Sequence, residues 1–307
     1  MPLVFNLRTV ITAVTVLTTT CIAAALPPVR RDASLEQTAL DKALYGTPAV
    51  AVVLDGRSGH ILATHHREEA GAVAATPGSI LKPLVLLTAL QQHVITPKTA
   101  IFCRRELHIG DRNLPCTHPQ SNITFTAEDA LAYSCNTYFA DLANRIHSED
   151  LVTALRGYHL GSATRLVSPE SSGTLTAPNT TEEKQLLVLG LSGVTATPLQ
   201  IAVAYRRLTG QVHNVEAHEE LRPVATGLRE SVQYGMAHNA DVSNVAISGK
   251  TGTASNPGQS WTHGWFAGFG SVGNRDIIVV IYIPHGNGAD AATFARLFFT
   301  QYRGAAQ

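Results

Sequence analysis

The chain has 307 residues, of which 45% are hydrophobic and 15% are charged, and its 23 lysine and arginine residues balance its 23 aspartate and glutamate residues. This composition supplies enough apolar side chains for a buried core and excludes a mainly disordered chain. The zero net charge, with no basic run longer than two residues, argues against nucleic acid as a partner.

The first 26 residues differ from the rest of the chain. Arg8 precedes an apolar, threonine-rich stretch over 10–25, and two prolines follow it. This order is typical of an export signal, which is either cleaved near its end or kept as an N-terminal anchor. We therefore expect an exported protein, periplasmic or extracytoplasmic, that meets the cytoplasmic membrane only through this segment. Lipidation at Cys21 is a weaker alternative, because Thr20 is bulkier than the residue that lipidation sites prefer.

A helix and a hairpin are expected next. Ser34 and Gln37 have the spacing of a capping box, and apolar residues follow at helical spacing up to Gly46. Residues 49–54 form a continuous apolar run, and residues 60–64 run back after a turn rich in glycine and serine. The pattern predicts a β-hairpin whose first strand is buried.

Helices dominate the middle of the chain. The stretch after Pro77-Gly78 is apolar on most sides, which predicts a buried helix that Ser79 opens, with Lys82 one turn later. Thr197-Pro198-Leu199-Gln200 combines a capping box with proline at the first helical position. The expected elements of this region are helices from Ser79, Thr126, Ser148 and Thr197, the last ended by Gly210, and loops at 100–124 and 162–180.

Strands return near the C-terminus, and this order decides the predicted fold class. The segments in question are strands at 245–253, 265–269 and 277–283, and a last helix at 289–302. Two strands early and three late predict an α/β fold of the α+β type, with one five-stranded antiparallel sheet covered by helices. A mostly helical subdomain is inserted at about 79–210, and residues 27–307 form a single domain.

Three further cysteines follow the one in the export segment. Cys103 and Cys116 flank a loop of turn-forming residues, and in an oxidising compartment they are the natural disulfide pair. Such a bridge stabilises by about 3 kcal/mol on loop-closure grounds. A zinc site is the rival interpretation, because His108 and His118 are close by, but these spacings match no common zinc finger. We expect Cys135 to pack as a small hydrophobic residue in the helical core.

Three short motifs carry the chemistry: Ser79-Ile80-Leu81-Lys82, Ser134-Cys135-Asn136 and Lys250-Thr251-Gly252. In the first, a hydroxyl and an amine three residues apart share one face at a helix N-terminus, where the dipole favours negative charge. An amine beside a hydroxyl is what activation of a serine nucleophile requires. We expect the three motifs to meet between the sheet and the helices.

This combination resembles the penicillin-binding proteins and their serine β-lactamase relatives, whose S-x-x-K, S-x-N and K-T-G motifs line the acylation site. The resemblance covers about residues 48–300. It includes the hairpin, Pro77-Gly78 before the nucleophile, the helix start at Thr197 and the segment His263-Gly264-Trp265-Phe266-Ala267-Gly268. Gly190-Leu191-Ser192-Gly193 departs from the G-Q-G-like turn that many transpeptidases have at this place.

The resemblance assigns a role to each motif residue. It implies that Ser79 attacks a peptide carbonyl to form an acyl-enzyme, that Lys82 is the base and must be neutral to act, and that Ser134 relays the proton. It also implies that the backbone N–H groups of Ser79 and Thr253 form the oxyanion hole. The implied substrate-binding residues, on a strand edge that glycine leaves open to an extended peptide, are Asn136, Lys250, Thr251, Gly252 and Thr253.

The implied function is that of a peptidoglycan D,D-transpeptidase that acts on D-Ala-D-Ala stem peptides and binds penicillin. Its partners are peptidoglycan stem peptides, β-lactams as covalent inhibitors and other cell-wall enzymes, and the chemistry calls for no cofactor and no metal. Because only about 20 residues separate the export segment from the hairpin, we expect a minimal single-domain enzyme without a glycosyltransferase domain or N-terminal pedestal.

Three alternatives stay open. A D,D-carboxypeptidase differs only in that water replaces the acceptor amine. A serine β-lactamase needs fast deacylation, but Glu170-Ser171-Ser172-Gly173-Thr174 does not match the E-x-x-L-N loop, and the carbamylated-lysine type has an aliphatic residue where Asn136 stands. The third is a binding module, either a β-lactam sensor or a low-activity partner of another wall enzyme.

Overall fold

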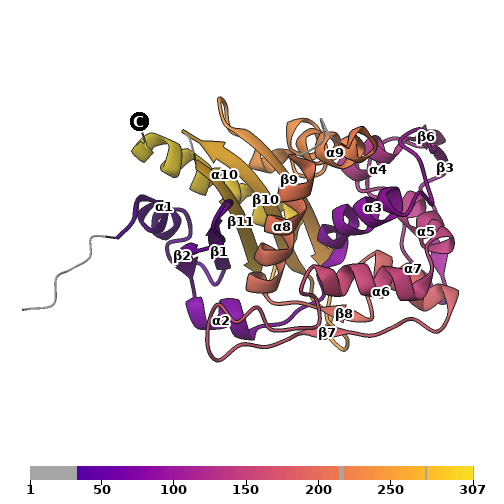
Figure 1. The fold of residues 1–307 in the computed structure, drawn as a ribbon, viewed down its shortest axis with the longest axis horizontal. Helices are drawn as coiled ribbons and strands as arrows, with labels where there is room; N and C mark the ends of the chain where they lie inside the picture. Colours follow the sequence, from indigo (N-terminus) through magenta and orange to yellow (C-terminus); the bar gives the residue numbers. More distant parts are fainter. Residues whose placement is uncertain (1–32, 214–217, 274, 307) are drawn as a thin grey trace, which may run out of the picture. The chain divides into compact units, whose positions relative to one another are not determined.

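A five-stranded antiparallel sheet with helices on both faces lies at the centre of the protein (Figure 1). The computed structural model describes residues 33–213, 218–273 and 275–306, so the predicted export segment and Cys21 lie outside the described residues. The sheet has the order β2-β1-β11-β10-β9, in which the strands are β1 (Val50–Asp55), β2 (Ile61–His65), β9 (Ala246–Ala254), β10 (His263–Val272) and β11 (Arg275–Ile283). The early hairpin pairs with the last strand, with Val52 opposite Val280, so early and late strands form one antiparallel sheet, as predicted.

The helices and short elements follow one another between and after these strands. The α-helices are α1 (Leu35–Ala43), α2 (Arg67–Ala72), α3 (Lys82–Gln91), α4 (Ala127–Ala132), α5 (Asn136–Arg145), α6 (Ser148–Gly157), α7 (Thr181–Val188), α8 (Pro198–Val212), α9 (Arg222–Gln233) and α10 (Gly288–Ala306). The 3-10 helices are η1 (Gly78–Leu81), η2 (Glu219–Leu221) and η3 (His238–Ala240). The short strands are β3 (Ile101–Cys103), β4 (His108–Ile109), β5 (Arg112–Asn113), β6 (Ile123–Phe125), β7 (Thr174–Leu175) and β8 (Val194–Thr195).

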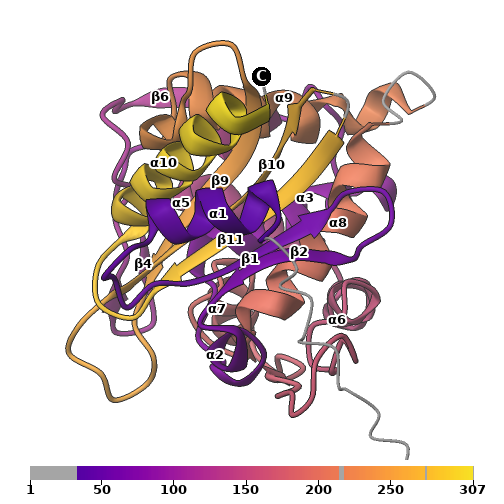
Figure 2. The same ribbon diagram turned by 90° about the vertical axis from the view of Figure 1, so that its left-hand side faces the viewer.

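The sheet separates two hydrophobic cores. Figure 2 shows α1 and α10 in front of one face, and Figure 1 shows α8 and α3 beyond the other. Because successive residues of a strand point to opposite faces, Ala51 and Val53 of β1 pack on the α1 and α10 side. Val50, Val52 and Leu54 pack on the side of α3 and α8. This two-sided burial explains why β1 reads as a continuous apolar run.

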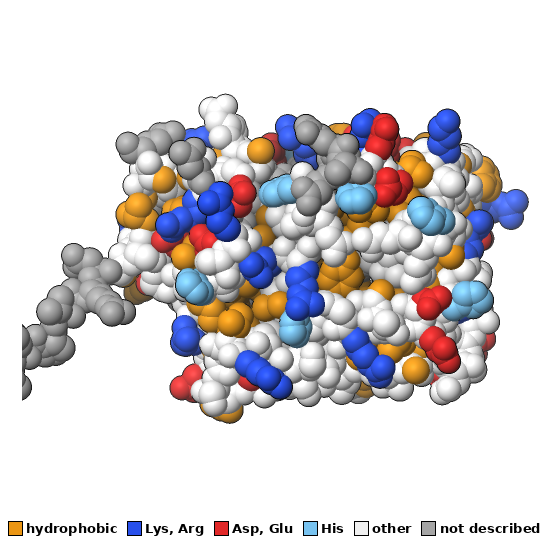
Figure 3. All heavy atoms as spheres, viewed as in Figure 1, with side chains coloured by type: hydrophobic (Ala, Val, Ile, Leu, Met, Phe, Trp, Pro, Cys, Tyr) orange, Lys and Arg blue, Asp and Glu red, His pale blue; other side chains and the backbone are white. Residues whose placement is uncertain are grey.

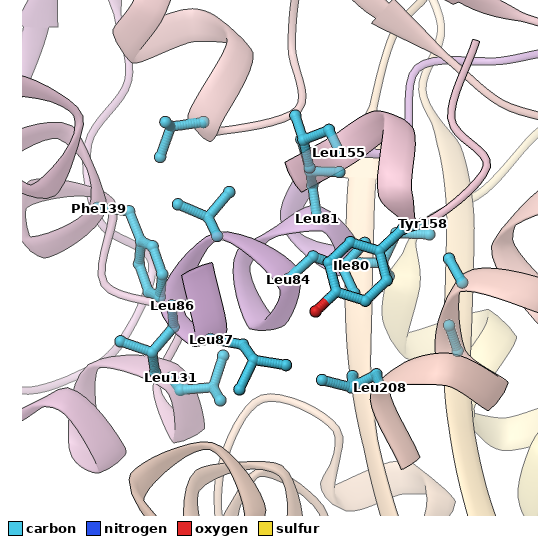
Figure 4. Close-up of a cluster of buried hydrophobic side chains, with 14 of the residues drawn as sticks. Ile80, Leu81, Leu84, Leu86, Leu87, Leu131, Phe139, Leu155, Tyr158 and Leu208 are labelled. Carbon is cyan, nitrogen blue, oxygen red and sulfur yellow. The ribbon is translucent and has the colours of Figure 1, made fainter. Parts of the chain in front are cut away.

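The helix α3 lies inside the second core. Every residue from Lys82 to Leu90 is buried, and in Figure 4 leucines surround this helix on several sides. Full burial of one leucine side chain stabilises by about 2 kcal/mol. The helix α3 therefore packs against the core on all sides, and this packing fixes the position of Lys82 at its start.

Local signals predicted some boundaries and missed others. Thr197 and Gln200 form the predicted capping box of α8, which runs to Val212 and not to Gly210. At α1, Ser34 caps the helix as predicted, but the side chain of Gln37 bonds Asp41 and the backbone of Thr64, so the reciprocal half of that capping box is missing. The hydrogen bonds of Gln37 to Thr64 in the hairpin thus replace the bond that its side chain would make to the backbone of Ser34.

The middle of the chain contains strands that the pattern did not predict. The expected loop at 100–124 holds two small hairpins, β3 with β6 and β4 with β5, and α9 was not predicted. The helical pattern that begins at Thr126 breaks after Ala132 and resumes at Asn136. The short strands are two to three residues long, so no clear period marks them. The helix α9 does carry an amphipathic pattern, with Val224, Leu228 and Val232 buried at helical spacing, which our prediction missed.

The described residues contain no helix that is both long and apolar enough to cross a membrane. On the face of the protein that Figure 3 shows, basic and acidic side chains are interspersed. Both observations concern only the part of the chain that the structure describes.

Candidate active site

Ser79 lies in a 3-10 turn and not at the start of the α-helix, which corrects our prediction. The turn is η1, and α3 begins at Lys82. The reason is Pro83, which has no backbone N–H and so cannot make the α-helical bond to the carbonyl of Ser79. The N–H of Lys82 bonds that carbonyl instead, which closes a tighter turn. The half-buried Ser79 therefore sits on a short turn directly before a buried helix.

The segment before Ser79 is tied to the sheet. The carbonyl of Thr76 accepts hydrogen bonds from His263 Nε2 at 2.8 Å and from Trp265 Nε1 at 3.0 Å. Both donors belong to β10 and are buried. The sequence analysis included His263 and Trp265 in the family resemblance but gave neither side chain a role. A histidine and a tryptophan two residues apart were the only signal for their contact with Thr76.

The second motif forms a strained turn between α4 and α5. Ser134 has φ 56°, which is the left-handed region that residues other than glycine rarely adopt. The turn is closed by a bond from the N–H of Cys135 to the carbonyl of Ala130 at 2.9 Å. This conformation explains why the helical pattern is interrupted, and it places Ser134 and Asn136 on either side of the buried Cys135.

Lys82 joins the first motif to the second. Its Nζ donates to Asn136 Oδ1 at 2.7 Å, to the carbonyl of Ser134 at 2.8 Å and to Ser134 Oγ at 3.2 Å. The amine also lies 5.2 Å from the centre of the Phe139 ring, a neighbour that sequence reasoning missed. All three donor positions of an ammonium group thus have acceptors, and Ser134 Oγ is within reach of a proton on Lys82.

Burial shapes the protonation of both lysines. Loss of solvent lowers the pKa of Lys82 to about 8, while the thiols of Cys135 and Cys116 act in the opposite direction. The pKa of Lys250 is lowered well below its ordinary value by burial and then by the charge of Lys82. A neutral amine at Lys82 is therefore accessible near neutral pH, as a general base requires.

The third motif packs directly against the turn of the first. A Cβ on Gly252 would lie 2.5 Å from the carbonyl oxygen of Pro77, so only glycine allows β9 to approach η1 this closely. On the other side of the turn, Gly190 has φ 70°, and a Cβ there would lie 2.2 Å from the carbonyl oxygen of Gly78. The N–H of Gly78 also bonds the carbonyl of Gly190. The loop that departs from the expected G-Q-G-like turn thus still supports the nucleophile turn.

The polar side chains of β9 already have partners. Lys250 is fully buried, and its Nζ bonds the carbonyl of Thr251 at 3.1 Å. Thr251 Oγ1 donates to the carbonyl of Met236 at 3.1 Å. Thr253 is exposed, and its Oγ1 accepts a bond from the N–H of Gly288 at 2.9 Å, which leaves its O–H as a donor. Because β9 is an edge strand, Thr253 is presented at the border of the sheet.

The predicted disulfide between Cys103 and Cys116 is wrong for this structure. Both are free cysteines whose sulfurs lie 3.6 Å apart, against about 2.05 Å in a disulfide. Cys116 Sγ also lies 3.8 Å from Cys135 Sγ, so Cys103 and Cys135 are about equally close to it and neither is its clear disulfide partner. Cys135 is buried as predicted, but its neighbours include a thiol and are not purely apolar.

A family model for the penicillin-binding protein transpeptidase domain matches residues 49–300. The chain belongs to this family. The matched stretch contains all five strands of the central sheet and all three motifs. The recognition made from the motifs is confirmed.

Two curated relatives in this family are named peptidoglycan D,D-transpeptidases. FtsI of Buchnera aphidicola is 33% identical over 136 residues, which cover 42% of this chain and 22% of that protein. MrdA of Acinetobacter baumannii is 23% identical over 278 residues, which cover 73% of this chain and 41% of that protein. The chain therefore spans less than half the length of these relatives.

A solved structure from the family confirms the fold class. The transpeptidase domain of penicillin-binding protein 3 from Burkholderia pseudomallei superposes with a TM-score of 0.74 at 20% identity, covering 87% of this chain and 90% of that one. The five-stranded antiparallel sheet with its helical insertion is thus the fold of the penicillin-binding transpeptidase domains.

Proposed function

We propose that this chain is a serine D,D-transpeptidase that acylates Ser79 with peptidoglycan stem peptides ending in D-Ala-D-Ala. One observation carries the proposal: the buried Lys82 bonds Ser134 and Asn136, one turn from Ser79. Two relatives named peptidoglycan D,D-transpeptidases support it. The proposal includes residues 27–307 as one domain, exported by the segment before them.

The proposed acylation begins with a proton transfer. Neutral Lys82 takes the proton of Ser79 Oγ, the oxygen attacks the carbonyl of the penultimate D-alanine, and the backbone N–H groups of Ser79 and Thr253 stabilise the oxyanion. The proton passes from Lys82 through Ser134 Oγ to the nitrogen of the leaving D-alanine. The C–N bond then breaks and an ester on Ser79 remains.

Transfer completes the reaction. The amine of a neighbouring stem peptide attacks the ester, a new amide forms, and the proton returns to Ser79. Removing one oxyanion donor from such a site costs about 3 kcal/mol of transition-state stabilisation. The substrate peptide runs along the edge strand β9, where the O–H of Thr253 donates to its terminal carboxylate.

Hydrolytic outcomes are the second candidates. A carboxypeptidase would use the same residues with water as the acceptor. A β-lactamase would need a group that activates the deacylating water, and the carboxylate of Glu170 is instead held by the N–H groups of Thr164 and Arg165, both at 2.7 Å. Glu170 thus stabilises its own loop, which favours a long-lived acyl-enzyme with β-lactams.

A fluorescent penicillin tests the proposal. Purified wild-type protein should become covalently labelled, and the adduct should persist for many minutes. Ser79→Ala should remove the label, and Ser243→Ala, which changes an exposed serine, should keep it. Rapid loss of label would indicate a β-lactamase, and no label at all would indicate a non-catalytic partner of another wall enzyme. Incubation with a D-Ala-D-Ala stem peptide, with and without an amine acceptor, then separates transfer from hydrolysis.

A further inference from the structure

Three cysteines and one histidine meet in the interior beside the second motif. Cys103 ends β3, Cys116 and His118 lie on the loop between β5 and β6, and Cys135 directly precedes α5. Each of the four residues is at most 2% exposed. Their sulfur and nitrogen ligand atoms all lie within 4.8 Å of one another. Strong metal ligands from three separate segments thus share one small volume.

Three of the six distances between the ligand atoms are close to those of ligands around a tetrahedral ion. With Zn–S bonds of about 2.3 Å and Zn–N bonds of about 2.0 Å, a tetrahedral site holds its sulfurs about 3.8 Å apart and a sulfur and a nitrogen about 3.5 Å apart. Here Cys103 Sγ lies 3.6 Å from Cys116 Sγ, and Cys116 Sγ lies 3.8 Å from Cys135 Sγ. Cys103 Sγ lies 3.6 Å from His118 Nε2.

We propose that Cys103, Cys116, His118 and Cys135 bind one structural Zn²⁺ in a closed Cys₃His site. Four protein ligands leave no position open for water, as in structural zinc sites. On binding, the three thiols release their protons to solvent and coordinate as thiolates. The sequence spacings hid this site, because Cys135 comes from a catalytic motif and the loop between the ligands is folded by long-range contacts.

Donors around the sulfurs suit thiolates. The N–H of Arg105 points at Cys103 Sγ at 3.3 Å, and the N–H of Thr137 points at Cys116 Sγ at 3.5 Å. Thr137 Oγ1 lies 3.4 Å from Cys103 Sγ and 3.5 Å from Cys116 Sγ. Cys135 stands at the N-cap of the ten-residue helix α5, where the dipole favours a negative sulfur. Each sulfur thus has a group that stabilises negative charge.

A disulfide satisfies the cluster less well than an ion does. Cys116 is almost equally far from Cys103 and Cys135, so either bond would leave one cysteine over. It would also leave His118, whose Nδ1 has no hydrogen-bond partner among the described residues and whose Nε2 faces a sulfur. An ion bound at Nε2 gives the imidazole a ligand bond that a disulfide does not offer.

The site would hold part of the acylation machinery in place. Cys135 lies between Ser134 and Asn136, and Asn136 Nδ2 donates to the carbonyls of Leu114 at 3.2 Å and Pro115 at 3.3 Å, directly before Cys116. An ion bound to Cys116 and Cys135 therefore ties together the loop and the turn that hold Asn136. Zinc acts here by positioning Ser134 and Asn136 for Lys82, without touching the substrate.

Metal content tests the site without reference to activity. Full-length protein purified from zinc-containing medium without chelator should hold about one zinc per chain by inductively coupled plasma mass spectrometry. His118→Ala and Cys103→Ser should lose it. The matched controls are His108→Ala, which removes an exposed histidine of β4, and Cys21→Ser, and both should keep it. Equal zinc in His108→Ala and His118→Ala would overturn the assignment.

Cobalt provides a readout on the wild type, in case a variant fails to fold. Protein stripped with a strong chelator and loaded with Co²⁺ should show thiolate-to-cobalt charge-transfer bands and the strong visible bands of a tetrahedral ion, and Zn²⁺ should displace it. No stoichiometric zinc and no such spectrum would overturn the proposal. So would stoichiometric iron or copper, or an intact mass two hydrogens below the fully reduced chain, which indicates a disulfide.

Labelling by fluorescent penicillin tests the positioning role. Stripping zinc should slow labelling, by up to about 10²-fold for displacements near 1 Å, and adding Zn²⁺ back should restore it. Labelling at the same rate with and without zinc would overturn the positioning role. A protein that holds zinc but is never labelled would instead count against the proposed acylation chemistry, so the two failures are distinguishable.

Discussion

Lys82 Nζ donates to Asn136 Oδ1 at 2.7 Å, although 54 positions separate the two residues in the chain. This bond joins the start of the buried helix α3 to the start of α5, across the strained turn at Ser134. Because Lys82 is fully buried, its amine depends on these few acceptors for its solvation. The geometry of the second motif therefore sets the protonation of the proposed base, and the predictions begin there.

The rate of acylation should depend on pH through Lys82. Burial lowers the pKa of this amine to about 8, and only the neutral form accepts a proton. Labelling of Ser79 by a fluorescent penicillin should therefore rise about tenfold per pH unit below pH 8 and level off above it. Lys82→Met removes the amine at similar volume, and its labelling should be slow and flat with pH. A wild-type rate that does not change between about pH 6 and pH 9 would contradict the role of Lys82.

Gly252→Ala should separate the strand of the third motif from the turn of the first. The added Cβ would lie 2.5 Å from the carbonyl oxygen of Pro77, so either β9 or η1 must move. We expect a lower melting temperature and loss of penicillin labelling. Gly210→Ala is the matched control, because its Cβ meets nothing within 4 Å inside α8. That change should stabilise the protein by about 1 kcal/mol, and equal effects of the two changes would show that the close approach is unimportant.

Gln200 should contribute more to the free energy of unfolding than Thr197, its partner in the capping box of α8. Its Nε2 donates to the carbonyls of three residues on a long loop, His159, Ser162 and Ser172, and it is fully buried. Thr197→Ala should cost about 1 kcal/mol of unfolding free energy. Gln200→Ala should cost about 2 kcal/mol or more, because three part-buried carbonyls lose their common donor. Urea denaturation measures both, with the exposed Gln233→Ala as the control.

Glu36 should make the free energy of unfolding fall as the pH is lowered into the acidic range. Burial alone raises the pKa of this carboxyl, but hydrogen bonds from its own backbone, Tyr302 and Arg275 outweigh burial and leave the pKa lowered. An unfolded glutamate titrates at about 4.3, so the unfolded chain takes up the proton first. The stabilisation is present above that pH and is lost as pH falls through the lowered pKa of the folded state.

The matching variant is Glu36→Gln. It should unfold at lower urea than wild type at neutral pH, by about 1–3 kcal/mol, and the difference should shrink as the pH falls below about 4. Glu149→Gln, an exposed residue of α6, should stay within about 0.5 kcal/mol of wild type. A difference between Glu36→Gln and wild type that grows with acid would reverse the sign derived above.

The sequence by itself determined the sheet and the motif set, because both are written in local patterns. The continuous apolar runs at 49–54 and 277–283 record burial on two faces, and they pair in the structure as β1 with β11. The capping box at Thr197 needs only four neighbouring residues, and it formed as predicted. The motifs of Ser79, Ser134 and Lys250 are likewise short, so their spacing was sufficient for the family.

Tertiary structure alone decided the environment of those motifs. The turn at Ser134 adopts a left-handed backbone that no local signal in its sequence requires, and the approach of Gly190 to Gly78 joins residues more than a hundred positions apart. The cysteines show the same limit. In sequence, Cys103 and Cys116 are two ends of one loop, but packing of that loop against the start of α5 brings Cys135 and His118 to the same sulfurs. Spacing along a chain ranks partners by loop-closure entropy, whereas the folded core selects them by position, and here it gathers four ligands where the sequence suggested a pair.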